Sequence, residues 1–266
     1  MSYQIVVCGG LAPDPLQTLE PVSSPTGPAL KNEMMLPAVL DPWASHALYE
    51  AAHLAKQFPG SKVTLVSMSP KAKLQQVMMT IAQKVAFELA AIDGPANGFV
   101  DSACAATALA AAIEAIPGLD RSKLIVCGGW ESATRGSGTT MQMVGERLGI
   151  TEQFQGVDEL RPQPDGSFEI VERLEGGKRQ ISRCEGAPMV LGWATGTLPE
   201  PPNQPQLGMQ NMRLIMPALQ KAKPATVTST IAWKTAAVPS QQRETRIVKD
   251  MPAADIAREL VEWIEQ

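Results

Sequence analysis

The chain has 266 residues, of which 44% are hydrophobic and 19% are charged. This composition supplies enough apolar surface for the core of one large globular domain, with or without an appendage. The 27 acidic residues outnumber the 23 basic ones, which gives a formal net charge of −4, and the sequence has no basic cluster. Binding to nucleic acid or to an anionic membrane therefore has no electrostatic support.

The sequence carries no signal for a membrane, a secretory route or a metal. No apolar stretch approaches membrane-spanning length, and the N-terminus lacks the pattern of a cleaved leader, so we expect a cytoplasmic protein without direct membrane insertion. The four cysteines have no paired spacing, and His46 and His53 lie seven residues apart on one predicted helix, too far to share a metal ion. Neither a disulfide framework nor a metal site is predicted.

The N-terminal part of the chain predicts a strand, a long loop and a helix. Residues 3–8 form an apolar run that ends in two glycines. The prolines between residues 13 and 28 exclude a helix or a central strand there, so we expect a loop. Asp41 is suited to cap a helix over 43–56, because the proline after it fits the first helical position.

Alternating strands and helices follow. The sequence predicts a strand at 62–68, a helix after Ser69-Pro70, a strand at 85–90 and an alanine-rich helix at 102–116. This repetition with short connections is typical of a parallel sheet layered by helices, and ligands of such sheets bind beyond the carboxyl ends of the strands. The glycine and serine residues that end these strands should therefore converge on one crevice.

The segment 124–143 carries the strongest functional signal. An apolar strand over 124–128 gives way to small and hydroxyl residues, and a helix is predicted to begin near Thr139. Free backbone N–H groups at that helix start, together with the hydroxyls of Ser137 and Thr140, form a suitable seat for a phosphate. An ordinary strand-to-helix connection built from small residues is the alternative interpretation.

No catalytic residue is predicted. Glu131 and Asp41 are the carboxylates near the crevice, and they suit a loop anchor and a helix cap better than acid–base chemistry. Arg135 lies within the loop, where it could balance the charge of an anion or be solvated. The sequence from Cys8 to Asp14 faintly resembles a pyrophosphate loop of nucleotide hydrolases, but a cysteine replaces its serine and the aspartate falls two residues late.

The C-terminal half predicts a hairpin, a buried strand and an extended arm. Strands over 168–174 and 178–184 flank a Glu-Gly-Gly turn, and 188–194 is a buried strand. Prolines and then polar residues dominate until an amphipathic helix over 252–265. We therefore predict a three-layer, Rossmann-like α/β domain with a parallel sheet over 1–196, a proline-rich insertion and loop over 197–223, and a C-terminal arm over 224–266.

Several motifs resemble the β subunit of electron-transfer flavoprotein, over nearly the whole chain. Asp41-Pro42-Trp43 is similar to the Asn-Pro-Phe helix start of that family, and Gly129 to Thr140, followed by Gln142-Met143, resembles its nucleotide loop. The Glu-Gly-Gly turn at 175–177 and the segment 212–223 resemble two further family motifs. The order and spacing of the motifs together make the resemblance fairly specific.

The resemblance implies a heterodimer whose α subunit holds a redox FAD, while the β subunit clamps that flavin and carries a structural AMP. Trp43 stands at the family's aromatic position beside the flavin, where the ring would pack against the flavin or against the partner subunit. Met216, followed by Pro217, stands where the family has an anchoring leucine on a loop that docks partner dehydrogenases. The implied AMP site consists of Cys8, Asp41, Pro42, Trp43, Ala44, Met68, Gly129, Glu131, Thr134, Arg135, Gly136, Ser137, Gly138, Thr139 and Thr140.

The function implied by the resemblance is that of an electron carrier without catalytic residues of its own. Electrons would arrive from a flavin-dependent dehydrogenase and leave toward a membrane quinone oxidoreductase, while the C-terminal arm would wrap the α subunit. The sequence departs from the family at Thr134-Arg135-Gly136, where consecutive aspartates are usual, and at Gly10, where a lysine is usual. The bound nucleotide is therefore either AMP or a second FAD of an electron-bifurcating relative, and an adenine-nucleotide hydrolase is a third reading. The longer segment 197–210 suggests an unusual partner dehydrogenase.

Overall fold

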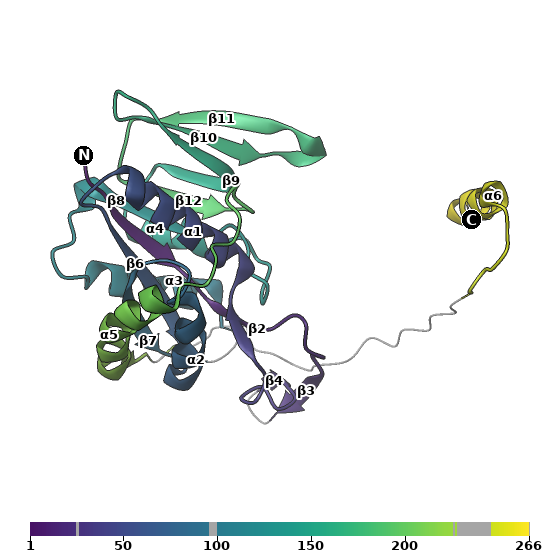
Figure 1. Cartoon of the computed structure of the whole chain (residues 1–266), viewed down its shortest axis with the longest axis horizontal. Helices are drawn as coiled ribbons and strands as arrows, with labels where there is room; N and C mark the ends of the chain where they lie inside the picture. Colours follow the sequence, from purple (N-terminus) through teal and green to yellow (C-terminus); the bar gives the residue numbers. More distant parts are fainter. Residues whose placement is uncertain (25–26, 96–99, 226, 228–245, 266) are drawn as a thin grey trace. The chain divides into compact units, whose positions relative to one another are not determined.

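The computed structural model describes residues 1–24, 27–95, 100–225, 227 and 246–265. The chain divides into two compact units, Met1–Ala236 and Ala237–Gln266. Among the described residues, the first unit contains a nine-stranded sheet with helices on both faces (Figure 1). The second unit contains helix α6 (Ala253–Ile264).

The large sheet has the strand order β11-β10-β9-β12-β8-β1-β6-β7-β13. All neighbouring strands in the part β9-β12-β8-β1-β6-β7-β13 are parallel. Strands β10 and β11 form an antiparallel hairpin that extends the sheet beyond β9. The central strands β1, β8 and β12 are apolar without alternation because both of their faces are covered. The strand bounds are Gln4–Cys8 (β1), Lys62–Ser69 (β6), Glu88–Asp93 (β7), Leu124–Gly129 (β8), Gln153–Pro162 (β9), Phe168–Arg173 (β10), Arg179–Cys184 (β11), Met189–Trp193 (β12) and Lys223–Pro224 (β13).

Helices on the two faces of the sheet complete two separate hydrophobic clusters. Helices α1 (Pro42–Gln57), α2 (Lys71–Ile81) and α5 (Pro205–Lys221) supply the cluster on one face, and α3 (Ser102–Glu114) and α4 (Thr140–Arg147) supply the other (Figure 1). Successive residues of a strand point to opposite faces, so Ile5 and Val7 join the first cluster while Val6 joins the second. The predicted three-layer α/β fold is therefore confirmed.

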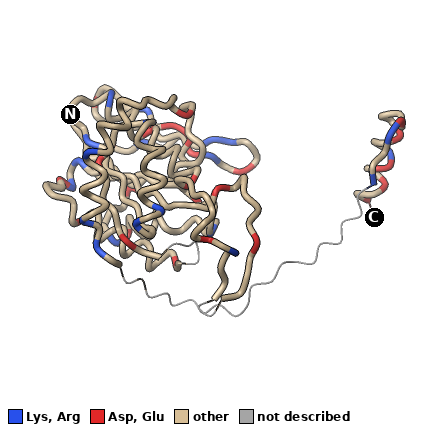
Figure 2. The backbone as a smooth tube through the Cα atoms, turned by 60° about the horizontal axis from the view of Figure 1, so that its bottom comes forward, with Lys and Arg blue, Asp and Glu red and all other residues tan. Residues whose placement is uncertain are grey.

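The charges of the first unit are mixed. Figure 2 shows Lys and Arg positions interspersed with Asp and Glu along its backbone. This distribution agrees with the absence of a basic cluster in the sequence.

The proline-rich N-terminal segment contains more regular structure than the sequence predicts. Strands β2 (Leu11–Pro13) and β5 (Ala38–Leu40) pair with each other, as do β3 (Pro21–Ser24) and β4 (Gly27–Leu30). Both pairs are two-stranded and antiparallel, so every strand in them is an edge strand. Proline is tolerated at such edges because its missing N–H need not face a partner.

Two predictions in the middle of the chain need correction. The strand predicted at 85–90 is β7, which is shifted to Glu88–Asp93, because buried Val85 and Phe87 lie in the turn before it. The segment predicted as a partner-recognition loop is mostly helix α5. Its Ile215 and Leu219 are buried at helical spacing, and the Asn211 amide donates to the carbonyl oxygens of Ala82 (2.7 Å) and Val85 (2.8 Å).

Strand β9 is absent from the sequence prediction altogether. Its sequence is rich in polar residues and gives no clear alternation, yet it pairs with β12 on one side and with β10 on the other. The hairpin itself and the buried strand β12 lie where the sequence predicts them.

Helix α6 of the second unit confirms the predicted terminal helix. Its Ile256, Leu260 and Ile264 lie at helical spacing, and none of its residues is buried. Residues 226, 228–245 and 266 of the predicted arm lie outside the described residues. The division at residues 196 and 223 stays a prediction.

Candidate functional site

A pocket lies at the carboxyl ends of β1, β6 and β8, between α1 on one side and α3 and α4 on the other. The residues that follow the three strands meet there, as the sequence predicts. The lining residues from these strand ends are Cys8, Gly9, Gly10, Leu11, Met68, Ser69, Gly129, Trp130 and Glu131.

Asp41 joins the first helix to the loop that follows β8. The residue is buried and is the N-cap of α1, where its Oδ1 accepts a hydrogen bond from the backbone N–H of Trp43 (3.2 Å). Its Oδ2 accepts a second bond from the N–H of Ala133 (2.7 Å), 92 residues away in sequence. Burial raises the pKa of Asp41, and these backbone donors oppose that rise. The carboxylate therefore fixes the loop against α1.

Glycines allow the loop to pass close to its neighbours. A Cβ atom on Gly129 would lie 2.7 Å from the carbonyl oxygen of Glu131 and 2.7 Å from the Cβ of Trp43, so a larger residue does not fit. Gly136 (φ 60°) and Gly138 (φ 64°) adopt the left-handed conformation, which costs other residues about 1–2 kcal/mol. The loop between β8 and α4 thus keeps its path only with these residues.

The N-terminus of α4 opens onto the pocket without a side-chain cap. Thr139 is the N-cap residue but makes no capping hydrogen bond, whereas Asp41 and Asp101 cap α1 and α3 through their carboxylates. Thr139, Thr140 and Met141 all line the pocket. Uncapped N–H groups and the helix dipole favour an anion at this position.

Arg135 spans the pocket wall between two helix starts. Its Nη1 donates to the carbonyl oxygen of Val100 (2.9 Å), next to the start of α3, and its Nη2 donates to Oγ1 of Thr140 (3.2 Å) at the start of α4. Its Nε is buried without a hydrogen-bond partner. Burial lowers the pKa of Arg135, and Asp41 and Asp101 oppose this at a distance, so the guanidinium stays charged.

The structure brings most of the predicted site residues together. Trp43, Pro42 and Gly136 do not line the pocket, although Trp43 is half-buried directly beside Gly129. Met216 and Pro217 belong to α5 and are also not part of it. The predicted residues that line the pocket are Cys8, Asp41, Ala44, Met68, Gly129, Glu131, Thr134, Arg135, Ser137, Gly138, Thr139 and Thr140.

The sequence prediction missed the wall contributed by α3. Gly9, Gly10 and Ser69 follow predicted strands and line the pocket as expected, although they are not part of the implied AMP site. The contributions of α3 and the turn before it follow only from the tertiary structure. The lining residues that the sequence analysis did not place at the site are Leu11, Pro95, Val100, Ala105, Leu109 and Met141.

The pocket offers binding groups but no activated nucleophile. Burial raises the pKa of the Cys8 thiol to about 12, with a further contribution from Cys127, so the thiol is protonated at neutral pH. Among the described residues, no group of three or more His, Cys, Asp or Glu side chains could hold a metal ion. In the same part of the chain, no helix combines the length and the apolar character needed to cross a bilayer.

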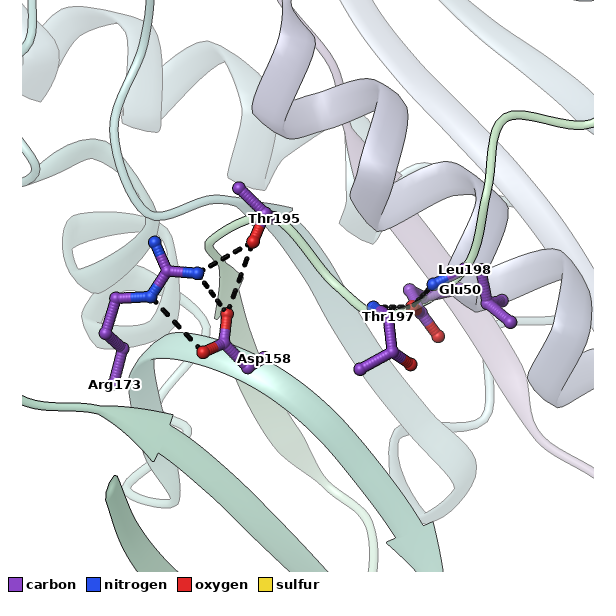
Figure 3. A network of polar contacts seen from close by, with 6 residues as sticks. All are labelled: Glu50, Asp158, Arg173, Thr195, Thr197 and Leu198. Atoms are coloured by element: carbon purple, nitrogen blue, oxygen red, sulfur yellow. Dashed lines mark hydrogen bonds and ion pairs between the residues drawn. The ribbon is translucent and has the colours of Figure 1, made fainter. Parts of the chain in front are cut away.

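A second polar network holds the chain where it leaves β12 (Figure 3). Arg173 donates through Nε and Nη2 to the buried Asp158 carboxylate (3.2 and 2.7 Å), and the same Nη2 also donates to Oγ1 of Thr195 (2.7 Å). Two residues further on, Oε1 of Glu50 accepts the backbone N–H groups of Thr197 (3.0 Å) and Leu198 (3.2 Å). The start of the proline-rich segment is therefore bound to both β9–β10 and α1.

Comparison with curated proteins finds no match to this chain. The family model of the electron transfer flavoprotein domain, however, matches residues 32–232, which includes α1, the loop after β8 and α5. The matched region covers well over half of the chain and most of the pocket described above. The chain therefore belongs to the electron transfer flavoprotein domain family.

Proposed function

We propose that this chain is the β subunit of a heterodimeric electron-transfer flavoprotein. In this role it binds an adenine nucleotide in its own pocket and presses on a redox FAD that is held mainly by the α subunit. Electrons enter from a flavin-dependent dehydrogenase and leave toward a membrane quinone oxidoreductase. The chain acts as a cytoplasmic electron carrier subunit and contributes no catalytic residue.

The observation that carries the proposal is the set of unused donors at one end of the pocket. The start of α4 has no side-chain cap, and the charged guanidinium of Arg135 lies beside it. A phosphate group would accept hydrogen bonds from the free N–H groups of α4, with the hydroxyls of Ser137 and Thr140 within the same wall. Apolar side chains of Ala105 and Leu109 form another part of the lining and suit a purine base. The residues present therefore fit an adenylate, and AMP is the nucleotide expected.

Trp43 supports the proposed role beside the flavin. Its backbone is fixed by Asp41, and its side chain is half-buried against Gly129, outside the nucleotide pocket. When bound, the FAD supplies the electron-transfer chemistry. The contribution proposed for Trp43 is to pack against the flavin and to exclude water from that side.

Two exposed apolar surfaces support the proposed partners. Helix α6 leaves Leu260, Trp263 and Ile264 exposed, and an amphipathic helix with no buried residue is suited to bind a second chain. We assign this helix to the α subunit. On α5, Leu214 and Pro217 are exposed while Met216 is half-buried. We assign docking of the dehydrogenase to the exposed face of α5 around Met216.

A second FAD in place of AMP is the alternative, favoured by one feature. Arg135 adds a positive charge to the loop where the family usually has consecutive aspartates, and this exchange suits the pyrophosphate of a dinucleotide. An electron-bifurcating flavoprotein would use such a second flavin. The adenine-nucleotide hydrolase reading has no comparable support, since Cys8 is a protonated thiol.

The nucleotides released from the purified complex test the proposal. The chain is co-expressed with the α subunit from the same source, purified without added nucleotide and denatured, and the supernatant is analysed by chromatography and mass spectrometry. One FAD and one AMP per heterodimer is the expected result, and two FAD would favour the alternative. A complex without any adenine nucleotide beyond the α-subunit FAD, or ATP turnover by this chain alone, would contradict the proposal.

A further inference from the structure

The loop between β8 and α4 is held from two sides of the nucleotide pocket. On the side of α1, the N–H of Ala133 donates to the buried carboxylate of Asp41 (2.7 Å). On the side of α3, the side chains of Arg135 and Ser137 contact residues 100–102. Residues of α1, of α3 and of the loop itself line the pocket, so the loop bridges two of its walls.

The two attachments differ in kind. The Asp41 carboxylate is buried and also accepts the N–H of Trp43, so it holds the loop within the folded core. On the other side, Nη1 of Arg135 donates to the carbonyl oxygen of Val100 (2.9 Å). The Oγ atoms of Ser137 and Ser102 lie 3.0 Å apart in an exposed contact. Water replaces an exposed contact between neutral hydroxyls more readily than a buried contact to a carboxylate. The loop is therefore held less firmly at α3 than at α1.

The backbone between the two attachments is suited to move. Gly136 (φ 60°) and Gly138 (φ 64°) lie within it, and glycine has access to more backbone conformations than any other residue. Thr134, Gly136 and Ser137 are exposed, so their displacement breaks no core packing. Movement about the Asp41 attachment would therefore separate the loop from α3 and open the pocket on that side.

We propose that residues 134–137 form a strap that is fixed beside Asp41, closes against the start of α3 and moves away from α3 when the adenine nucleotide enters or leaves. This inference rests on the proposed function, because it requires an adenylate in the pocket. The strap carries Arg135 and Ser137, so closing it brings both side chains to the phosphate position. Ser102 does not line the pocket, and it is a positioning residue that acts through Ser137.

A cross-link between the strap and α3 tests whether the strap must open. Ser102→Cys and Ser137→Cys are introduced together, and Cys104→Ser removes the nearby thiol of α3, since the other cysteines are buried. The heterodimer with the α subunit is loaded with radiolabelled AMP in the reduced state, and release into excess unlabelled AMP is measured. We expect the oxidised form to release AMP at least about tenfold more slowly than the reduced form. Equal release rates in both forms would overturn the proposal.

A second cross-link controls for oxidation itself. Glu169 and Arg183 lie opposite each other on β10 and β11, outside the pocket. Glu169→Cys with Arg183→Cys, also combined with Cys104→Ser, should release AMP at the same rate when oxidised and when reduced. Equal slowing in this control would show that oxidation rather than the strap limits release, which would also overturn the proposal.

Variants of Ser102 test the strap without a cross-link and decide the question if the disulfide does not form. Ser102→Ala removes the contact in the free and the nucleotide-bound protein alike. Its association and dissociation rates for AMP should therefore both rise about three- to tenfold, as expected for one lost hydrogen bond. The Kd should stay within about twofold, because opening becomes easier in both states. Ser102→Thr keeps the hydroxyl and should keep the wild-type rates.

The outcomes separate the strap from the proposed function. Unchanged AMP exchange in Ser102→Ala, or faster dissociation with an unchanged association rate, would overturn the strap and leave the adenylate pocket intact. Failure of the wild-type heterodimer to bind any adenine nucleotide in this pocket would instead contradict the proposed function on which the strap rests.

Discussion

The loop after β8 and the segment after β12 leave the sheet at neighbouring strand ends, and the two are joined where Trp130 N donates to the carbonyl oxygen of Trp193 (2.9 Å). Both are tied to α1 by a carboxylate, from Asp41 in the first case and Glu50 in the second. The loop after β8 nevertheless keeps an uncapped helix start and an unpartnered Arg135 Nε, whereas Asp158, Arg173 and Glu50 bond the second segment closely to the core (Figure 3).

This difference shows that the same kind of contact, a carboxylate of α1 or its cap bound to backbone N–H groups of a connection, can have two different results. A carboxylate that is at least partly buried and accepts backbone N–H groups holds a connection in a fixed path. Where the connection retains free donors, the fixed path creates the proposed binding site. Where its polar groups are used within the protein, the fixed path sets the direction in which the chain continues toward α5.

The largest expected effect comes from removing the Asp41 carboxylate. Asp41→Ala should lower the free energy of unfolding by about 2 kcal/mol and adenine-nucleotide affinity by at least about tenfold, because both the α1 cap and the Ala133 contact are lost. Denaturant unfolding and nucleotide titration measure the two effects. Asp120→Ala removes a cap at an exposed turn, where Oδ1 accepts from Ser122 N (3.1 Å), and should change stability alone. A normal nucleotide affinity in Asp41→Ala would show that the loop does not depend on this contact.

A glycine pair tests whether the loop path itself forms the site. Gly138 and Gly176 have similar positive φ angles, 64° and 71°, but only Gly138 lines the pocket. Alanine at either position should destabilise the protein by about 1–2 kcal/mol. Only Gly138→Ala should weaken nucleotide binding, by several-fold. Equal loss of nucleotide affinity in both variants would indicate a general effect of stability.

The proposed docking surface on α5 can be divided into exposed and packed residues. Leu214 is 60% exposed, whereas Met216 packs against the core formed with α1 and α2. Leu214→Ala should slow flavin reduction by the partner dehydrogenase without a change in melting temperature. Met216→Ala should in addition lower stability by about 1–2 kcal/mol, since it leaves a partial cavity. An unchanged reduction rate in both variants would remove α5 from the docking surface.

The smallest expected effect concerns the pH dependence of the Glu50 contact. Burial raises the pKa of Glu50, so the folded state binds its proton more tightly than the unfolded chain does. The stabilisation that comes from binding this proton is complete when the pH lies below the pKa of Glu50 in the unfolded chain. It is lost as the pH rises through the pKa of Glu50 in the folded protein. Glu50→Gln keeps an acceptor for the N–H groups without the charge. Its melting temperature relative to wild type should be highest at neutral pH and fall on acidification, whereas a constant difference would contradict this reading.

The sequence predicts those parts of the molecule whose local and tertiary preferences agree. The central strands are continuous apolar runs, and the glycines at 136 and 138 predict turns in the loop that contains them. The prediction for β2 to β5 and for the start of α5 was wrong because edge strands and the first turn of a helix tolerate proline, which central elements do not. Pro217 lies inside α5, so the first-turn rule does not explain it. Ala105 and Leu109 could not be assigned to the pocket, since only the packing of α3 over β6 and β7 places them there.

A density map of the purified heterodimer, determined without added nucleotide, tests the central claim most directly. We predict an adenylate with its phosphate between Arg135 and the start of α4, and the isoalloxazine ring of a partner-bound FAD against Trp43. A pocket that holds no nucleotide, or a flavin placed away from Trp43, would contradict the assignment of this chain as a nucleotide-stiffened β subunit.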